Sequence, residues 1–116
     1  MLFLQYPPCS TCQRAKKWLD DHGLTYDDRH IKEYNPTYDE LVMWHRQSGL
    51  PLKRFFNTSG LRYKELNLKE KLASMTQEEQ LVLLSSDGML VKRPIVIYDG
   101  TVLVGFKESE WEQIML

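Results

Sequence analysis

The sequence lacks several features that would indicate a specialised environment. Its 116 residues include only two cysteines and no run of the roughly 18 apolar residues that a membrane span requires. Neither sign of charge dominates, because the formal net charge is −1. Membrane integration and direct binding of nucleic acid are therefore not expected. Residues 1–6 lack the basic region of a secretory signal, so we expect a cytoplasmic protein.

The overall composition of the chain is that of an ordinary globular protein. Hydrophobic residues make up 42% of the chain and charged residues 27%, close to the usual values. A chain of this length can bury a core without disulfide bonds to reinforce it. We expect a single domain that spans residues 1–116.

The N-terminal part predicts a strand, a helix and a second strand. Residues 2–5 are apolar and are followed by two prolines, which predicts a short buried strand. Residues 9–23 have an apolar face of helical spacing and end at a glycine, and a second strand is expected at about 25–29. A strand–helix–strand unit favours parallel pairing of its two strands.

The middle of the chain predicts helices. Thr37 with Glu40, and Thr76 with Glu79, have the spacing of a capping box, in which two residues exchange hydrogen bonds at a helix start. We expect one helix from Thr37 to Gly49 and another from Thr76 to about Ser86, with short helical pieces between them. Residues of about 34–88 are therefore predicted to form a helical insertion.

The C-terminal part returns to strand signals. Residues 95–98 and 101–104 are rich in β-branched side chains and flank Asp99-Gly100, which predicts a β-hairpin. Residues 108–116 suit a closing helix that packs on the sheet. The predicted fold class is α/β, a mixed β-sheet flanked by helices with a helical subdomain inserted.

Both cysteines lie in the segment Tyr6-Pro7-Pro8-Cys9-Ser10-Thr11-Cys12-Gln13-Arg14, where the first strand gives way to the first helix. Ser10 and Gln13 have capping-box spacing, so Cys9 is expected just before the helix and Cys12 in its first turn. Free N–H groups and the positive dipole at a helix start favour an anion, either a thiolate or an oxyanion substrate. We expect a lowered pKa for Cys9, and Arg14 adds positive charge nearby.

Three other interpretations of the cysteine pair compete with this one. A zinc site needs two further ligands, and the three histidines lack the paired spacing of such sites. A structural disulfide over so short a loop constrains the unfolded chain little. Two buried, unreactive thiols are the remaining alternative, because free cysteines are often small core residues.

Several motifs in the chain resemble those of the arsenate reductase and Spx family of thioredoxin-like proteins, over essentially its full length. They are Cys9-Ser10-Thr11-Cys12, Phe56-Asn57-Thr58-Ser59-Gly60, Tyr63-Lys64-Glu65-Leu66, Lys92-Arg93-Pro94-Ile95 and Val104-Gly105-Phe106-Lys107-Glu108. The resemblance implies a thioredoxin-like fold in which Pro94 has a cis peptide bond and packs against the cysteine site. It also implies that Arg93 lies beside Cys9 as a partner for an anion or thiolate.

Family members that reduce arsenate hold the oxyanion with several arginines, and here only Arg93 matches such a position. Asn57 stands where those reductases have an arginine before the Tyr-Lys-Glu-Leu-like turn, and Phe106-Lys107 stands near their third arginine. Arginine suits this role because its planar group donates paired hydrogen bonds. The further residues that we assign to substrate binding are Ser10, Thr11, Arg14, Pro94 and Lys107.

The leading hypothesis is a thiol–disulfide oxidoreductase similar to arsenate reductases, with Cys9 as nucleophile, Cys12 as the resolving cysteine and Arg93 as a catalytic partner. The resemblance implies glutathione, glutaredoxin or thioredoxin as electron donor, an oxyanion as substrate, and no bound cofactor or metal. The alternative is an Spx-like redox-sensing regulator that binds the C-terminal domain of the RNA polymerase α-subunit. Gly49 lies near the glycine that such regulators use, although a glycine after a helix is also an ordinary cap.

Overall fold

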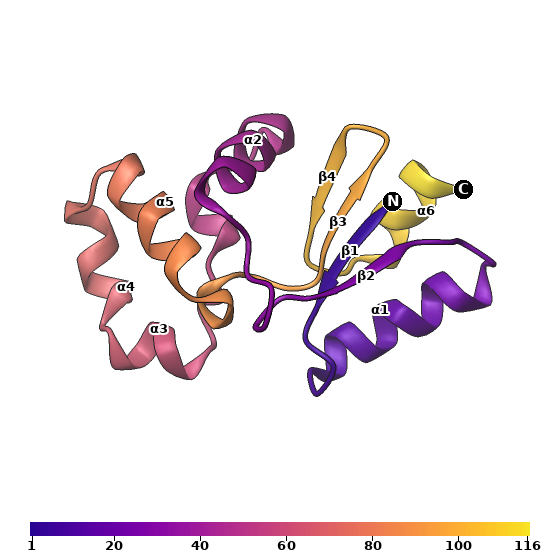
Figure 1. Cartoon of the computed structure of the whole chain (residues 1–116), viewed down its shortest axis with the longest axis horizontal. Coiled ribbons are helices and arrows are strands. Elements are labelled where there is room, and N and C mark those ends of the chain that lie inside the picture. Colours follow the sequence, from indigo (N-terminus) through magenta and orange to yellow (C-terminus); the bar gives the residue numbers. More distant parts are fainter.

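The computed structural model describes residues 1–116 and contains one four-stranded sheet with helices on both sides (Figure 1). The strands are β1 (Leu2–Gln5), β2 (Asp27–His30), β3 (Ile95–Tyr98) and β4 (Thr101–Val104), and their order in the sheet is β2-β1-β3-β4. β1 pairs with β2 in parallel, whereas β3 is antiparallel to both β1 and β4. The predicted mixed sheet, parallel pair and hairpin are confirmed, and β2 begins two residues later than expected.

The helices fall into two groups. α1 (Ser10–Asp21) and α6 (Glu108–Met115) lie on one side of the sheet, and the other helices lie on the opposite side (Figure 1). The second group consists of α2 (Tyr38–Ser48), α3 (Leu61–Glu65), α4 (Leu68–Lys71) and α5 (Gln77–Ser86), with short 3-10 turns at Leu52–Phe55, Leu72–Ser74 and Gly88–Leu90. None of the helices has the length and apolar character that crossing a membrane requires.

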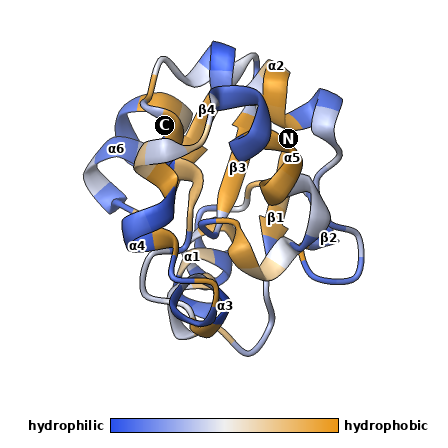
Figure 2. Cartoon of the chain, turned by 90° about the vertical axis from the view of Figure 1, so that its left-hand side faces the viewer, coloured by the Kyte–Doolittle hydropathy of each residue, from blue (hydrophilic) through white to orange (hydrophobic).

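The sheet separates two apolar cores because its strand residues point alternately to its two faces. Leu4 and Ile95 belong to the larger core, which has 17 buried residues and includes the helices between β2 and β3. Phe3 and Val96 belong to a smaller core of eight residues that joins α1 and α6 to the sheet. The apolar strands β1, β3 and β4 accordingly stand out inside the molecule when it is coloured by hydropathy (Figure 2).

The helices α2 and α5 begin as predicted. The Thr37 hydroxyl accepts from the Glu40 N–H at 3.1 Å, and the Glu40 carboxylate accepts from the Thr37 N–H at 3.0 Å. Thr76 and Glu79 make the same exchange at 3.1 and 2.9 Å. α2 ends at Gly49 with φ of 67°, a left-handed conformation that glycine adopts without strain. The two capping boxes and the glycine cap are therefore confirmed.

Candidate active site

The start of α1 differs from the prediction. The N-cap residue is Cys9, with extended φ and ψ of −75° and 122°, and no side chain forms a capping hydrogen bond there. The predicted Ser10–Gln13 capping box is wrong, because Ser10 already lies inside the helix and is exposed. The Gln13 amide instead donates to the Pro7 carbonyl at 3.0 Å. Cys9 therefore stands at the open end of the helix, with Cys12 in the first turn as expected.

The surroundings of Cys9 favour its thiolate. Partial burial alone would raise the pKa of this thiol, but the N–H and thiol of Cys12, the Arg93 guanidinium and the Thr11 N–H together outweigh that effect and lower the pKa. The two N–H groups belong to the second and third residues of α1, the ones that an N-cap side chain normally satisfies. The ionised Cys9 sulfur can thus act as the missing helix cap.

Cys12 has the opposite environment. Its side chain is completely buried, and the Tyr6 N–H donates to its sulfur at 3.5 Å. Burial, helped by the neighbouring Cys9 sulfur, raises the pKa of Cys12 to about 12 against the lowering effects of the Tyr6 N–H and Arg93. Cys9 is partly exposed, and neither cysteine is in a disulfide. One motif therefore holds an accessible sulfur that ionises readily and a buried sulfur that does not.

Arg93 reaches this motif from the far end of the sequence. Its peptide bond to Pro94 is cis, and Pro94 is buried. The guanidinium lies over the Tyr6 ring, 5.0 Å from the ring centre. Its Nε and Nη1 atoms are buried and have no hydrogen-bond partner within the protein. Because unpaired buried donors are costly, these atoms are well suited to an anion bound next to Cys9.

A cavity of about 430 Å³ contains Cys9 and brings together segments that are far apart in the sequence. Its lining residues are Cys9, Thr11, Arg14, Asn57, Ser59, Gly60, Lys92, Arg93, Gly105 and Phe106. Arg14, Lys92 and Arg93 form no ion pair with any carboxylate. The cavity is therefore an electropositive site around an accessible sulfur, suited to an anionic or polar substrate.

Not every residue assigned from the sequence lines this cavity. Cys9, Thr11, Arg14 and Arg93 do, whereas Ser10, Cys12, Pro94 and Lys107 are absent from its walls. Ser10 is exposed on α1, Pro94 is buried, and Lys107 is an exposed residue that precedes α6 as its N-cap. Asn57 and Phe106, noted as departures from the family pattern, both line the cavity.

Two residues near the cysteines were missed by the sequence interpretation. Lys92 lines the cavity, and its position beside the Arg93-Pro94 motif was the available signal. Tyr6 contributes its N–H to Cys12 and its ring to Arg93, and it opens the cysteine motif. No group of three or more His, Cys, Asp or Glu residues is arranged to hold a metal ion.

Comparison with known proteins agrees with this geometry. The ArsC family model matches residues 4–114. The Bacillus subtilis proteins "Uncharacterized protein YusI" and "Regulatory protein MgsR" are 53% and 29% identical over 113 and 110 residues, which cover 97% and 95% of this chain and 96% and 86% of theirs. A crystal structure from Bacteroides fragilis, described as related to the ArsC family, superposes with a TM-score of 0.95 at 58% identity, covering 97% of this chain and 95% of that one. The chain therefore belongs to the ArsC family and has its thioredoxin-like fold.

Proposed function

We propose that the protein is a cytoplasmic thiol–disulfide oxidoreductase of the arsenate reductase type, with Cys9 as nucleophile and Cys12 as resolving cysteine. The observation that carries this proposal is the opposite displacement of the two pKa values within one motif, lowered for Cys9 and raised to about 12 for Cys12. The thiolate is the reactive form of cysteine, so the first step falls to Cys9.

In the first step the Cys9 thiolate attacks one sulfur of a substrate disulfide. A bond forms between Cys9 and that sulfur, the substrate S–S bond breaks, and the other half leaves as a thiolate. The guanidinium of Arg93, which lowers the pKa of Cys9, would also stabilise negative charge on the departing sulfur. No bound cofactor is needed for this exchange.

In the second step the Cys12 sulfur attacks the Cys9 sulfur, and the bond between Cys9 and the bound half of the substrate breaks. The Cys12 thiol loses its proton in this step, and the departing thiolate takes up a proton. Besides burial, the raised pKa of Cys12 has two causes that come from the Cys9 sulfur, a hydrogen bond and a charge. Once Cys9 is covalently bound its sulfur carries no charge, so this cause disappears and the pKa of Cys12 falls, while burial still raises it. The product is a Cys9–Cys12 disulfide, which glutathione, glutaredoxin or thioredoxin would reduce again.

The same two cysteines can supply the two electrons for an oxyanion substrate. Cys9 would displace water from arsenate to form a sulfur–arsenic bond, and attack by Cys12 would release arsenite as the internal disulfide forms. The donors available to the oxyanion are Arg93, with its two unpartnered nitrogens, together with Arg14 and Lys92.

The test compares wild type with Cys9→Ser and Cys12→Ser on bis(2-hydroxyethyl) disulfide and on arsenate, with glutathione, glutaredoxin or thioredoxin as reductant. We expect Cys9→Ser to lose all turnover and Cys12→Ser to accumulate a mixed disulfide on Cys9, visible by mass spectrometry. Equal background rates for wild type and Cys9→Ser on arsenate would exclude arsenate reduction. Equal background rates on both substrates would overturn the enzymatic proposal.

A regulatory role of the Spx type is the second candidate, and the similarity to the relative named Regulatory protein MgsR favours it. In that role the Cys9–Cys12 disulfide would alter a surface that binds the α-subunit of RNA polymerase. Gly49 is exposed and has open space around it, which suits a contact surface as well as a helix cap. A pull-down with the C-terminal domain of the α-subunit, using oxidised and reduced protein, tests this role. Absence of binding in both states would remove it.

A further inference from the structure

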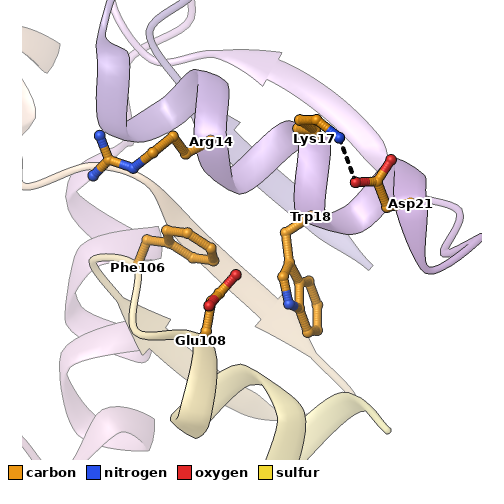
Figure 3. Close-up of a pocket in the computed structure, with 6 residues that line it drawn as sticks. All are labelled: Arg14, Lys17, Trp18, Asp21, Phe106 and Glu108. Carbon is orange, nitrogen blue, oxygen red and sulfur yellow. Dashed lines mark hydrogen bonds and ion pairs between the residues drawn. The ribbon is translucent and has the colours of Figure 1, made fainter.

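A second cleft lies along α1 (Figure 3). Its volume is about 530 Å³, and it lies between one side of α1 and the residues that lead into α6. The lining residues are Arg14, Lys17, Trp18, Asp21, Phe106 and Glu108. Arg14 and Phe106 also line the Cys9 cavity, so the two spaces lie next to each other.

The charges of this cleft leave one cation and one carboxylate without a charged partner. Lys17 and Asp21 neutralise each other through an ion pair of 2.6 Å. Arg14 has only the Thr11 hydroxyl as a partner, at 3.4 Å, which directs its guanidinium toward the Cys9 end of α1. Glu108 forms no hydrogen bond or ion pair through its side chain, and its carboxylate points toward α1 (Figure 3).

The aromatic wall of the cleft is fixed by edge-to-face packing. The Phe106 and Trp111 rings meet at 4.7 Å and 76°, and the Trp111 and Trp18 rings meet at 5.7 Å and 82°. Trp111 is completely buried, so it holds both cleft residues from behind. A wall of this kind presents a preformed apolar surface, which lowers the entropy cost of binding a ligand.

This arrangement selects the chemical class of the ligand. A simple anion would meet the Glu108 carboxylate, and a simple cation would meet Arg14. A group with both charges, the amino-acid zwitterion, satisfies both residues. Resting on the function proposed above, we propose that this cleft binds the amino-acid end of a low-molecular-weight disulfide whose sulfur is attacked by Cys9. Arg14 would bind the ligand's carboxylate and Glu108 its ammonium group.

The size of the two spaces agrees with such a ligand. Cavities of about 430 and 530 Å³ fall in the roughly 300–1,000 Å³ range of pockets that take organic ligands, which is much larger than an inorganic oxyanion requires. The Cys9 cavity would take the reacting disulfide, and the cleft would take the portion of the ligand that lies farther from the sulfur.

The binding test uses two unreactive thioethers, S-methylglutathione and S-methylcysteine, titrated into the reduced protein. The Trp18 indole nitrogen faces the cleft (Figure 3), so its N–H resonance should shift on binding, whereas that of Trp44, in the core on the other side of the sheet, should not. The tighter ligand of the two identifies whether the zwitterion sits beside the sulfur or one residue away. Absence of a Trp18 shift with both ligands would overturn the inference.

The matched variants are Glu108→Gln in the cleft and Glu110→Gln, an exposed residue of the same helix that does not line it. We expect Glu108→Gln to weaken binding of the tighter thioether about tenfold, as is usual when a hydrogen bond to a charged group is lost. Glu110→Gln should bind like wild type. Equal affinities for the two variants would overturn the assignment of Glu108.

The kinetic test separates this inference from the proposed function. In Glu108→Gln the preference for glutathione disulfide over bis(2-hydroxyethyl) disulfide, measured as a ratio of kcat/KM values, should fall about tenfold. Turnover of bis(2-hydroxyethyl) disulfide without thioether binding would overturn the cleft site alone. Thioether binding at Trp18 without turnover of any disulfide would support the site and overturn the enzymatic function.

Discussion

The start of α1 differs from the starts of α2 and α5 in how its free N–H groups are satisfied. Each helix begins with N–H groups that have no partner inside the helix. At α2 and α5 a threonine and a glutamate satisfy two of these N–H groups by exchanging hydrogen bonds, and acidic residues occupy the first turn. At α1 no side chain caps the helix and its first turn has no acidic residue. The position of the cap is held by Cys9.

The difference indicates where the fold uses its helix ends for stability and where it keeps one for chemistry. The N–H groups of Thr11 and Cys12 both lower the pKa of Cys9, so the helix stabilises a negative sulfur rather than a neutral cap. A capping box here would compete for those donors. Under the function proposed above, the uncapped helix leaves these donors free for the Cys9 thiolate.

The prediction with the largest expected effect tests whether the start of α1 and Arg93 act together in lowering the pKa of Cys9. Arg93→Gln removes a cause of the lowered Cys9 pKa, so we expect the pKa to rise and less thiolate to be present. The alkylation rate at pH 7 should fall about tenfold, the size expected for the loss of a hydrogen bond to a charged group. The measurement is the rate of iodoacetamide reaction against pH in a Cys12→Ser background. Arg46→Gln, at an exposed residue of α2, serves as control. An unchanged profile would mean that the helix start activates Cys9 alone.

The second prediction is a loss of stability when the cap of α2 or of α5 is removed. Thr37→Ala and Thr76→Ala each remove a reciprocal cap, and each should lower the free energy of unfolding by about 1 kcal/mol. Chemical denaturation measures this loss, and Thr25→Ala, an exposed threonine outside any helix, is the control. The alkylation rate of Cys9 should not change in either variant. A slower alkylation rate would show that the caps of α2 and α5 also affect the reactivity of Cys9 at the start of α1.

Replacing Cys9 is expected to change the free energy of unfolding by less, and in the opposite direction. Aspartate is a favourable N-cap residue, and its carboxylate can accept from the Thr11 and Cys12 N–H groups. Cys9→Asp should therefore raise the free energy of unfolding by about 0.5 kcal/mol while it abolishes disulfide exchange. Denaturation of this variant beside Cys9→Ala provides the comparison. Equal stability of the two would contradict the view that this helix end is left uncapped.

These contrasts also explain what the sequence could predict. The capping boxes of α2 and α5 were predicted correctly because their partners lie three residues apart, and the Asp99-Gly100 hairpin is equally local. The cavity around Cys9 was not predictable in this way, because its walls come from segments near residues 9–14, 57–60, 92–93 and 105–106. Only the family resemblance placed Arg93 beside Cys9, and the only signal for Lys92 was its position next to Arg93 in the same motif.

The Ser10–Gln13 pair shows why spacing alone was insufficient. Pro7 and Pro8 direct the chain so that Cys9, one residue earlier than Ser10, takes the extended cap conformation, and the Cys9 N–H donates to the Tyr6 carbonyl at 2.9 Å. Gln13 is then drawn back to the Pro7 carbonyl at 3.0 Å. A motif that matches a capping box by spacing was therefore overridden by the turn before it.

The smallest expected effect follows from this override. Ser10 is exposed and forms no hydrogen bond through its hydroxyl, so Ser10→Ala should change the free energy of unfolding by less than about 0.5 kcal/mol, the usual range for surface substitutions. Since alanine is also the better helix former inside the first turn, any change should be toward stability. Denaturation beside Thr37→Ala gives a direct comparison of a serine that resembles a cap with a threonine that is one. A loss as large as that of Thr37→Ala would mean that Ser10 caps α1 in solution, and the helix end would then not be free for Cys9.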